Sequence, residues 1–159
     1  MTFDQREFRN AVGCFATGVT IVTTLDKEGD RVGITANSFS SVSLDSPLVL
    51  FCVDAKISSF VAFENCENFN VNVLSADQIE LSNSFARSSE DKWDGIEHTF
   101  GDNSCPIFEN SIAVLECGKH AIYSAGDHLI IVGQVTKLAY ETVDRPPLLY
   151  FNGAYAALS

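Results

Sequence analysis

The residues best suited to chemistry form the run GITANSFSSVS, from Gly33 to Ser43, which follows a strand-like segment. Strand interiors favour Val, Ile and aromatic residues, whereas this run holds Gly, Ala, Asn and four serines. Small side chains leave backbone N–H groups uncovered, and the serine hydroxyls and the amide of Asn37 add short donors. Such a wall suits a flat ligand with polar edges. The alternative is a polar loop between two strands.

A second polar segment is DAKISS, Asp54 to Ser59, which lies after one predicted strand and before a predicted helix. Lys56, Ser58 and Ser59, together with the free N–H groups of a helix start, have the chemistry of an anion site. A solvated loop with a serine that caps the helix explains the same residues.

His128 follows the predicted turn Gly126–Asp127 and stands at the start of a strand. At the mouth of a pocket, an imidazole can contact a carboxamide or donate a proton. The alternative is that His128 only holds the turn. We interpret His98 and His120, which lack such a context, as surface or structural residues.

Composition excludes several classes of function. The chain has 159 residues and a formal net charge of −11, without a basic run, which argues against nucleic acid and anionic membranes as partners. The sequence also lacks the GxGxxG, GxxxxGK and GxSxG patterns of Rossmann, P-loop and hydrolase sites.

A length of 159 residues predicts one domain, residues 1–159.

The five cysteines show no CxxC spacing, so we expect neither a metal site nor a dithiol motif. Three of them, Cys14, Cys52 and Cys117, lie in apolar runs and are predicted to be buried free thiols. The N-terminal residues form no apolar signal-peptide core, and no stretch approaches the ~20 apolar residues of a membrane span. We therefore expect a cytoplasmic location.

Periodicity predicts a mainly β chain with a few short helices. A capping box of Thr2 and Gln5 is expected to start the first helix, and residues 88–110 are interpreted as an excursion or lid. The predicted helices are 2–15, 58–65 and 76–87, and the predicted strands are 19–25, 31–36, 48–53, 69–74, 112–123, 128–140 and 148–152. Hairpins and long strands of this kind are typical of an antiparallel barrel.

Six blocks of the sequence together resemble the flavin reductase-like family. They are FATGVTIVTT (15–24), GITANSFSSVS (33–43), SPLVLFCVD (46–54), FNVNVLSADQ (69–78), AGDHLIIVGQV (125–135) and RPPLLYFNGAY (145–155). They occur in the order typical of that family, and the resemblance covers nearly the whole chain. It implies the FMN-binding split-barrel fold, which we expect as a six-stranded antiparallel barrel of Greek-key type with peripheral short helices.

The resemblance also implies an activity. An NAD(P)H-dependent flavin reductase transfers a hydride to FMN, or to FAD, and supplies reduced flavin to a partner monooxygenase. We therefore expect FMN or FAD and NADH or NADPH as ligands, an oxygenase component as partner, and a homodimer. Two alternatives stay open: an electron-transfer flavoprotein that keeps FMN bound without being an enzyme, and a degenerate barrel that only binds a ligand.

The same resemblance assigns site residues by position. His128 is placed near the nicotinamide side of the flavin as the catalytic residue. The residues expected at the flavin ring are Thr35, Ala36, Asn37 and Ser38, with Cys52 and Val53 beneath the flavin and Ser41, Val42 and Ser43 at the ribityl chain. Lys56, Ser58 and Ser59 are expected to hold the phosphate, and Phe85, Ala86 and Arg87 to close the pocket. Tyr150 and Tyr155 match aromatic positions of the family in the C-terminal region.

Overall fold

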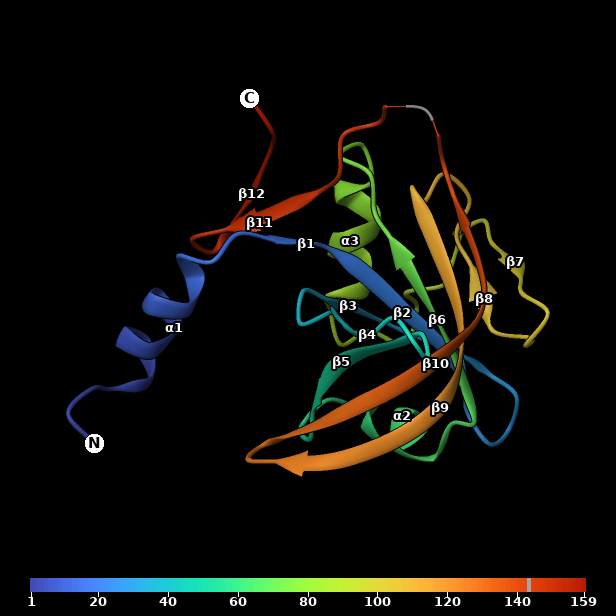
Figure 1. The fold of residues 1–159 in the computed structure, drawn as a ribbon, viewed down its shortest axis with the longest axis horizontal. Coiled ribbons are helices and arrows are strands. Elements are labelled where there is room, and N and C mark those ends of the chain that lie inside the picture. Colours follow the sequence, from blue (N-terminus) through green and yellow to red (C-terminus); the bar gives the residue numbers. More distant parts are fainter. Residues whose placement is uncertain (143) are drawn as a thin grey trace.

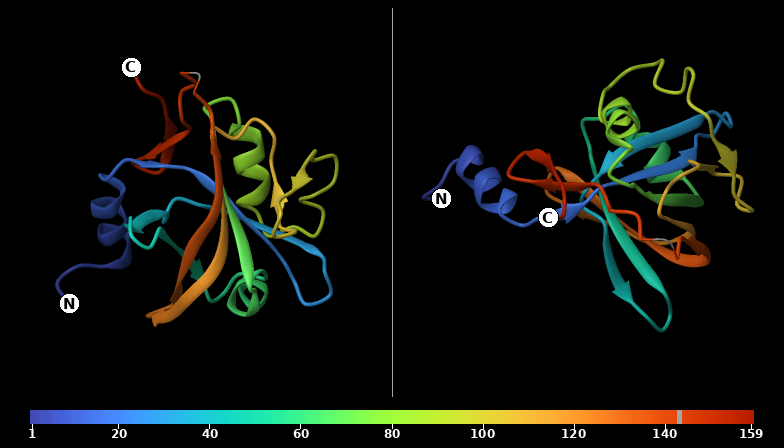
Figure 2. Two further views of the ribbon diagram at one scale, coloured as in Figure 1. Left: turned by 45° about the vertical axis from the view of Figure 1, so that its right-hand side comes forward. Right: turned by 90° about the horizontal axis from the view of Figure 1, so that it is seen from above.

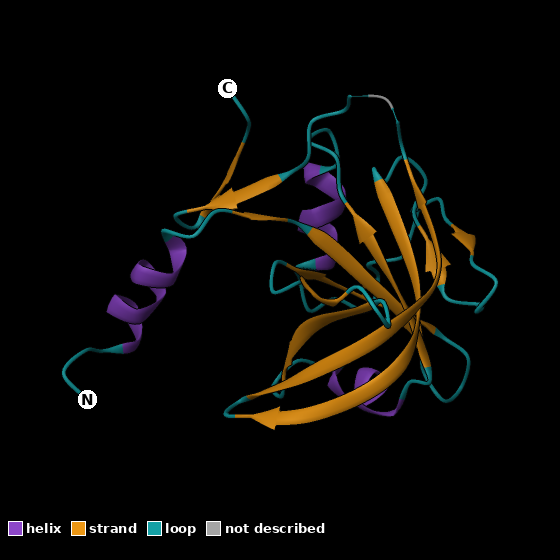
Figure 3. Cartoon of the chain, in the orientation of Figure 1, coloured by secondary structure: helices purple, strands orange, loops and turns teal. Residues whose placement is uncertain are grey.

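The structure is a computed structural model that describes residues 1–142 and 144–159. It is mainly β, with strands that curl around one another and few helices (Figures 1 and 3). The helices are α1 Gln5–Gly13, α2 Phe60–Asn65 and α3 Ile79–Phe85, and the strands are β1 Thr17–Gly18, β2 Thr20–Leu25, β3 Arg31–Ala36, β4 Ser40–Ser43, β5 Leu48–Asp54, β6 Asn68–Val73, β7 Thr99–Phe100, β8 Pro106–Ile107, β9 Ala113–Ala125, β10 His128–Tyr140, β11 Leu149–Phe151 and β12 Ala154–Ala156.

The main sheet has seven strands in the order β3-β2-β6-β9-β10-β5-β4, and every neighbouring pair is antiparallel. The mainly β class is confirmed, but the predicted six-stranded split barrel is not, because the main sheet has seven strands. Ser40–Ser43, predicted as part of a ligand wall, forms an additional strand that pairs with β5. Among the described residues no ladder joins β3 to β4, so the sheet has two free edges.

The inner face of the sheet encloses the larger hydrophobic core. Alternate residues of β5 point inward, and Val49, Phe51 and Val53 are buried. The Phe51 ring meets the rings of Phe63 on α2 and Phe69 on β6 edge to face, at centroid distances of 5.5 and 5.0 Å. Complete burial of each such side chain contributes about 1.5–3 kcal/mol, which fixes α2 against the sheet.

A second core cluster attaches α3 to the sheet. Its buried members are Val19, Ile21, Leu74, Phe85, Phe108 and Leu148. The helix is shorter than the predicted 76–87 because residues 75–78 form a turn, in which the backbone N–H of Ser75 donates to the Gln78 side chain at 3.0 Å. The end of α3 therefore carries Phe85 into the core and leaves the next residues at the surface.

The segment predicted to be a loose excursion is held by polar side chains at its C-terminal half. Asn70 donates to the carbonyl of Cys105 at 2.9 Å, and Asn72 accepts from the N–H of Phe108 at 3.0 Å. Thr23 donates to the carbonyl of Pro106 at 2.6 Å. The two asparagines are completely buried. Because a buried amide is costly without partners, these bonds fix residues 105–108 on the sheet.

Helix α1 lies apart from the main sheet, beside the small β1-β11-β12 sheet (Figures 1 and 2). Its capping box is formed by Asp4 and Glu7, at 2.8 and 2.9 Å, so the prediction of Thr2 and Gln5 was wrong by two residues. None of its residues is buried. The N–H of Asn152 donates to the carbonyl of Gly13 at 2.9 Å and connects the helix end to the β11–β12 turn.

The thiols are distributed differently from the prediction. Cys14 is exposed at the end of α1 and Cys52 is half-buried, so of the three predicted buried thiols only Cys117 is fully enclosed. Cys66 and Cys105 are buried as well. In the part of the chain that the structure describes, no helix is long and apolar enough to cross a membrane.

Candidate functional site

A cavity of about 260 Å³ lies between β3, β5, the start of β10 and the end of α3. We call it the edge cavity because β3 is an edge strand of the main sheet. Its lining residues are Ile34, Thr35, Ala36, Asn37, Ser38, Cys52, Asp54, Ile57, Ser58, Ser59, Phe85, Ala86, Arg87, Ser88, Lys92 and His128.

Most of the residues expected to form the site meet in this cavity, although they come from four separate parts of the chain. They are Thr35, Ala36, Asn37, Ser38, Cys52, Ser58, Ser59, Phe85, Ala86, Arg87 and His128. The fold therefore brings the GITANSF wall, the DAKISS segment and the GDH histidine together around one space.

The position of β3 explains the chemistry of the wall. The strand pairs with β2 on one side only, in a register that sets Ala36 opposite Thr20. The Thr20 hydroxyl donates to the carbonyl of Ala36 at 2.7 Å and fixes the end of the strand. An edge strand keeps a row of N–H and C=O groups without a ladder partner. These groups are available to the polar edge of a ligand.

Two hydroxyl groups of the wall are already used within the protein. Thr35 donates to the carbonyl of Ser82 at 2.6 Å, which ties β3 to α3. Ser38 accepts from the backbone N–H of Cys52 at 2.9 Å, which ties the loop after β3 to β5. Both residues shape the cavity, and their side chains are bound to the scaffold.

Other polar side chains of the cavity keep their hydrogen-bonding capacity. Among the described residues, no hydrogen bond engages the side chain of Asn37, Ser58 or Ser59. Ser59 takes the position before α2, but its hydroxyl does not cap the helix, contrary to the capping alternative. These three side chains are thus free to donate to a bound ligand.

His128 begins β10 and lies opposite Asp54 of β5 in the ladder. Its Nδ1 atom is 2.7 Å from the Asp127 carboxylate. The hydrogen bond from His128 holds the pKa of Asp127 below its usual value. Because a carboxylate accepts, Nδ1 carries the proton, and Nε2 is the ring nitrogen that remains available in the neutral imidazole.

Five predicted site residues of the β4–β5 region lie outside the edge cavity. Ser41, Val42 and Ser43 belong to β4, the opposite edge strand, and Val42 is 48% exposed. Val53 is 1% exposed because its side chain is part of the hydrophobic core, and it does not line the cavity. Lys56 is exposed in the turn after β5, where its N–H donates to Asp54 at 2.8 Å.

The two tyrosines also lie away from the cavity. Tyr150 of β11 and Tyr155 of β12 are cross-strand partners, with ring centroids 5.8 Å apart. The Tyr155 hydroxyl lies 2.7 Å from Ser82 and 3.0 Å from Asn83 and so anchors the small sheet on α3. Their placement follows from strand pairing, which the sequence blocks do not reveal.

Lys92 is the most informative lining residue that sequence reasoning missed. It lies in the segment interpreted as a lid, and its Nζ donates to the carbonyl of Gly33 at 3.1 Å. Burial lowers the pKa of this lysine. Ile34, Asp54, Ile57 and Ser88 were missed as well. A lone lysine in an irregular stretch carries no local signal, because only the tertiary fold brings it to β3.

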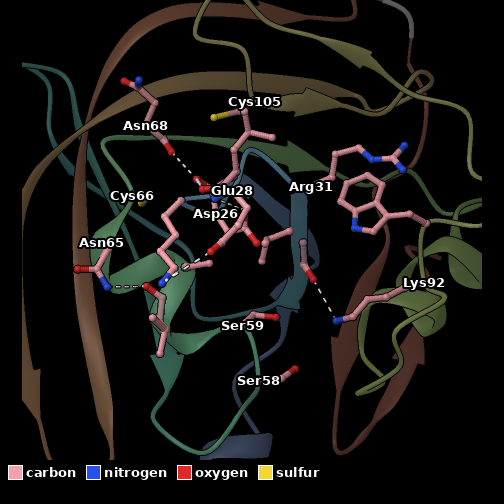
Figure 4. A pocket seen from close by; sticks show the side chains of 18 of the residues that line it. Asp26, Glu28, Arg31, Ser58, Ser59, Asn65, Cys66, Asn68, Lys92 and Cys105 are labelled. Atoms are coloured by element: carbon pink, nitrogen blue, oxygen red, sulfur yellow. Dashed lines mark hydrogen bonds and ion pairs between the residues drawn. The ribbon is translucent and has the colours of Figure 1, made fainter.

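A larger cavity of about 820 Å³ adjoins the first one (Figure 4). We call it the hairpin cavity because residues 24–33 of the β2–β3 hairpin form one wall, while α2 and residues 88–93 form others. Ser58, Ser59, Ser88 and Lys92 line both cavities, so the two spaces meet at these residues. Within the described residues, no group of three or more His, Cys, Asp or Glu is placed to hold a metal ion.

Known proteins resemble this chain over almost its whole length. Residues 12–159 match the family described as flavin reductase like domain. The chain is 44% identical over 153 residues to a probable flavin reductase of Rhizobium meliloti, a match that covers 96% of this chain and 49% of that protein. It is 38% identical to HsaB of Rhodococcus jostii, named as the reductase subunit of a flavin-dependent monooxygenase, with 98% and 78% covered.

A solved structure shares the fold over almost the whole chain. The NADH:FAD oxidoreductase SgcE6 of Streptomyces globisporus, solved with NAD and FAD fragments, superimposes with a TM-score of 0.92 at 35% identity and covers 98% of this chain and 93% of its own. The chain spans only about half the length of the Rhizobium meliloti relative. With its family match over residues 12–159, this chain belongs to the flavin reductase like family.

Proposed function

We propose that this chain, as a single domain, is a flavin reductase that uses NADH to reduce FMN or FAD and supplies the reduced flavin to a partner oxygenase. The observation that carries the proposal is the edge cavity, which joins an edge-strand wall, three unused polar side chains and His128 in one space. The names of the relatives, a flavin reductase, a monooxygenase reductase subunit and an NADH:FAD oxidoreductase, support it.

The residues of the edge cavity fit a flavin. The flavin ring has hydrogen-bonding atoms along one edge and two apolar faces. The β3 wall offers unpaired backbone groups for the polar edge, and Ile34, Ala36 and Ile57 offer apolar side chains for the faces. Ser58 and Ser59 keep free hydroxyls for the phosphate, and Arg87 and Lys92 supply positive charge in a chain of net charge −11.

The protein contributes position and electrostatics to this reaction, since hydride transfer is the chemistry of the bound flavin and nicotinamide. The wall at Thr35–Ser38 would orient the flavin ring, and its N–H groups would stabilise negative charge at the polar edge. Asp127 holds His128 through Nδ1 at 2.7 Å, which leaves Nε2 to hydrogen-bond a nicotinamide carboxamide. The catalytic role of His128 is thus one of orientation.

Flavin binding and NADH oxidation test the proposal directly. The purified protein should quench flavin fluorescence on binding and should oxidise NADH only when flavin is added. Asn37→Leu places bulk on the wall without breaking a scaffold bond, whereas Ser38→Leu would also remove the bond to Cys52. We expect Asn37→Leu to weaken flavin binding at least about tenfold.

Gln134→Leu is the matched control, because Gln134 is exposed on β10 and lines neither cavity. Flavin binding of the Asn37 variant equal to that of the control would disprove the placement of the ring. Bound flavin that NADH does not reduce would favour the electron-transfer flavoprotein instead.

We also propose that the protein is a homodimer. The exposed apolar residues Phe8 and Val12 lie four positions apart on α1, and exposed Phe15 follows in the segment just after the helix. A helix of nine residues with no buried side chain is not stable alone in water. A second copy would cover this face in an isologous pair.

A further inference from the structure

The hydroxyl group of Tyr155 is a polar group to which the proposed reaction assigns no role. Tyr155 lies on β12 in the small sheet and lines neither cavity. Its hydroxyl donates to Oδ1 of Asn83 at 3.0 Å and lies 2.7 Å from Oγ of Ser82. Because the phenolic proton is used on Asn83, the Ser82 hydroxyl is the donor of the second hydrogen bond.

Ser82 connects this tyrosine to the scaffold of the edge cavity. The residue lies on α3 and is 0% exposed. Among the described residues, its hydroxyl bonds only to Tyr155. A buried hydroxyl without a partner is costly, so this one bond determines where the Ser82 side chain is held. The position of this turn of α3 therefore depends on the small sheet.

The carbonyl of Ser82 joins two lining residues of the edge cavity. It accepts from the Thr35 hydroxyl at 2.6 Å and from the backbone N–H of Ala86 at 3.0 Å. Thr35 belongs to the β3 wall, and Ala86 caps the C-terminal end of α3. One oxygen atom thus holds two sides of the cavity together, and a shift of Ser82 would change their spacing.

Packing holds the Tyr155 ring in the position that this contact needs. The ring is partly buried against the core cluster that contains Phe85, itself a lining residue of the edge cavity. On its other strand neighbour, Tyr150, it packs edge to face. Because the ring is held by these contacts, its hydroxyl is preorganised for Ser82 instead of being turned toward water.

We propose that Tyr155 is a positioning residue for flavin binding, which acts through Ser82 to fix the spacing between the β3 wall and the end of α3. The inference rests on the proposed function, because flavin must occupy the edge cavity for this spacing to matter. A planar ring needs the two sides of its site at a fixed separation. Loss of the tyrosine hydroxyl should therefore weaken flavin binding and leave His128 in place.

Removal of the tyrosine hydroxyl tests this role. Tyr155→Phe keeps the ring and its packing and deletes only the oxygen that contacts Ser82. We expect the flavin dissociation constant, measured by fluorescence titration, to rise about threefold to tenfold, the loss expected for one neutral hydrogen bond. KM for flavin should rise by the same factor, whereas kcat at saturating flavin should stay within about twofold. Tyr140→Phe is the matched control, because Tyr140 is 70% exposed and lines neither cavity.

A second variant removes the other hydroxyl of the same bond. Ser82→Ala keeps the carbonyl that binds Thr35 and should weaken flavin binding as much as Tyr155→Phe. The double variant should bind flavin no more weakly than either single variant, since all three lose the same bond. Ser84→Ala is the control on the same helix, because the Ser84 hydroxyl donates to the carbonyl of Glu80 at 3.0 Å and lines neither cavity. Unchanged flavin binding by Ser82→Ala would overturn the inference even if Tyr155→Phe did not fold.

The remaining outcomes separate this inference from the proposed function. A Tyr155→Phe variant that is less stable in urea but binds flavin as tightly as the unmodified protein would assign the hydroxyl to folding alone and overturn the inference. Losses that multiply in the double variant would show that the two hydroxyls act separately, which would also overturn it. In both cases the flavin reductase proposal stands. Absence of any flavin binding by the unmodified protein would overturn both.

Discussion

Gly33 of β3 lies directly against the ring of Phe85 at the end of α3. A Cβ atom at position 33 would stand 2.8 Å from two carbons of that ring and 3.2 Å from the Trp93 indole. Phe85 is 1% exposed and lines the edge cavity, and the carbonyl of Gly33 holds Lys92. The absence of a side chain at this one position thus allows α3 and the segment after it to approach the strand.

Gly33→Ala should therefore destabilise the fold through overpacking. Since the ring of Phe85 is enclosed by Trp93 and Phe108, it cannot move aside cheaply. We expect the free energy of unfolding in urea to fall by about 1–3 kcal/mol. Gly18→Ala is the control, because nothing lies within 4 Å of a Cβ at Gly18. Equal stability of the two variants would show that β3 and α3 are not in close contact.

His128→Ala should impair the use of NADH while flavin still binds. Loss of the imidazole should lower kcat/KM for NADH by about tenfold to a hundredfold, which corresponds to about 1.4–2.7 kcal/mol of transition-state stabilisation. The dissociation constant for flavin should change little. If His128 only holds the turn with Asp127, the variant should instead lose thermal stability, flavin binding and NADH use together.

The thiol of Cys52 should report on the occupied edge cavity. Cys52 lines this cavity and is half-buried, whereas Cys14 is exposed on α1. A saturating flavin should slow alkylation of Cys52 by iodoacetamide several-fold and leave Cys14 unaffected, as measured by peptide mass spectrometry. Equal protection of both cysteines would indicate that flavin lowers thiol reactivity throughout the protein. No protection of Cys52 would place the flavin elsewhere.

The buried thiols should make the fold sensitive to alkaline pH. Burial raises the pKa of Cys105 to about 11 and that of Cys117 to about 12, against about 8.5 in an unfolded chain. Above that lower value the unfolded chain releases thiol protons that the folded chain retains. Stability is then fully present below about pH 8.5 and falls as the pH rises toward 11–12, by up to about 1.4 kcal/mol per pH unit for each thiol.

Urea unfolding at pH 8 and pH 10 measures this loss. Cys117→Ala should show a smaller decrease between the two pH values, although the variant starts from a lower stability because of the cavity it creates. Cys14→Ala should keep the full decrease, since Cys14 is exposed. A Cys117 variant with an undiminished decrease would assign the pH dependence to other groups.

Phe8→Asp should weaken the proposed dimer. The substitution puts a charge in the apolar row of α1, which a second copy would have to desolvate on association. Sedimentation velocity should show the unmodified protein at twice the mass of the chain and the variant shifted toward one chain. Asn10→Asp introduces the same carboxylate on the polar side of the helix and should leave the dimer intact. A monomeric unmodified protein would refute the proposal.

Local sequence signals were sufficient for the elements whose patterns are strong. The Thr-, Val- and Ile-rich run at 20–25, the hairpin after it and the long strands around Gly126–Asp127 are found where the sequence predicts them. The main blocks of the site were also visible, because small and polar residues contrast with the apolar strands beside them. The family could also be identified from the sequence, because the blocks and their order are read directly along the chain.

Only the tertiary structure decided which side chains face the edge cavity. Val53 and Cys52 are neighbours in the sequence, yet β5 turns the first into the core and the second toward the cavity. The role of Lys92 depends on a contact with Gly33, a residue 59 positions away. Such contacts are formed by packing between distant segments, and no local periodicity encodes them. Thus the sequence determined the strongly patterned elements and the family, and the packing of α3 and β10 against the sheet determined which residues line the candidate site.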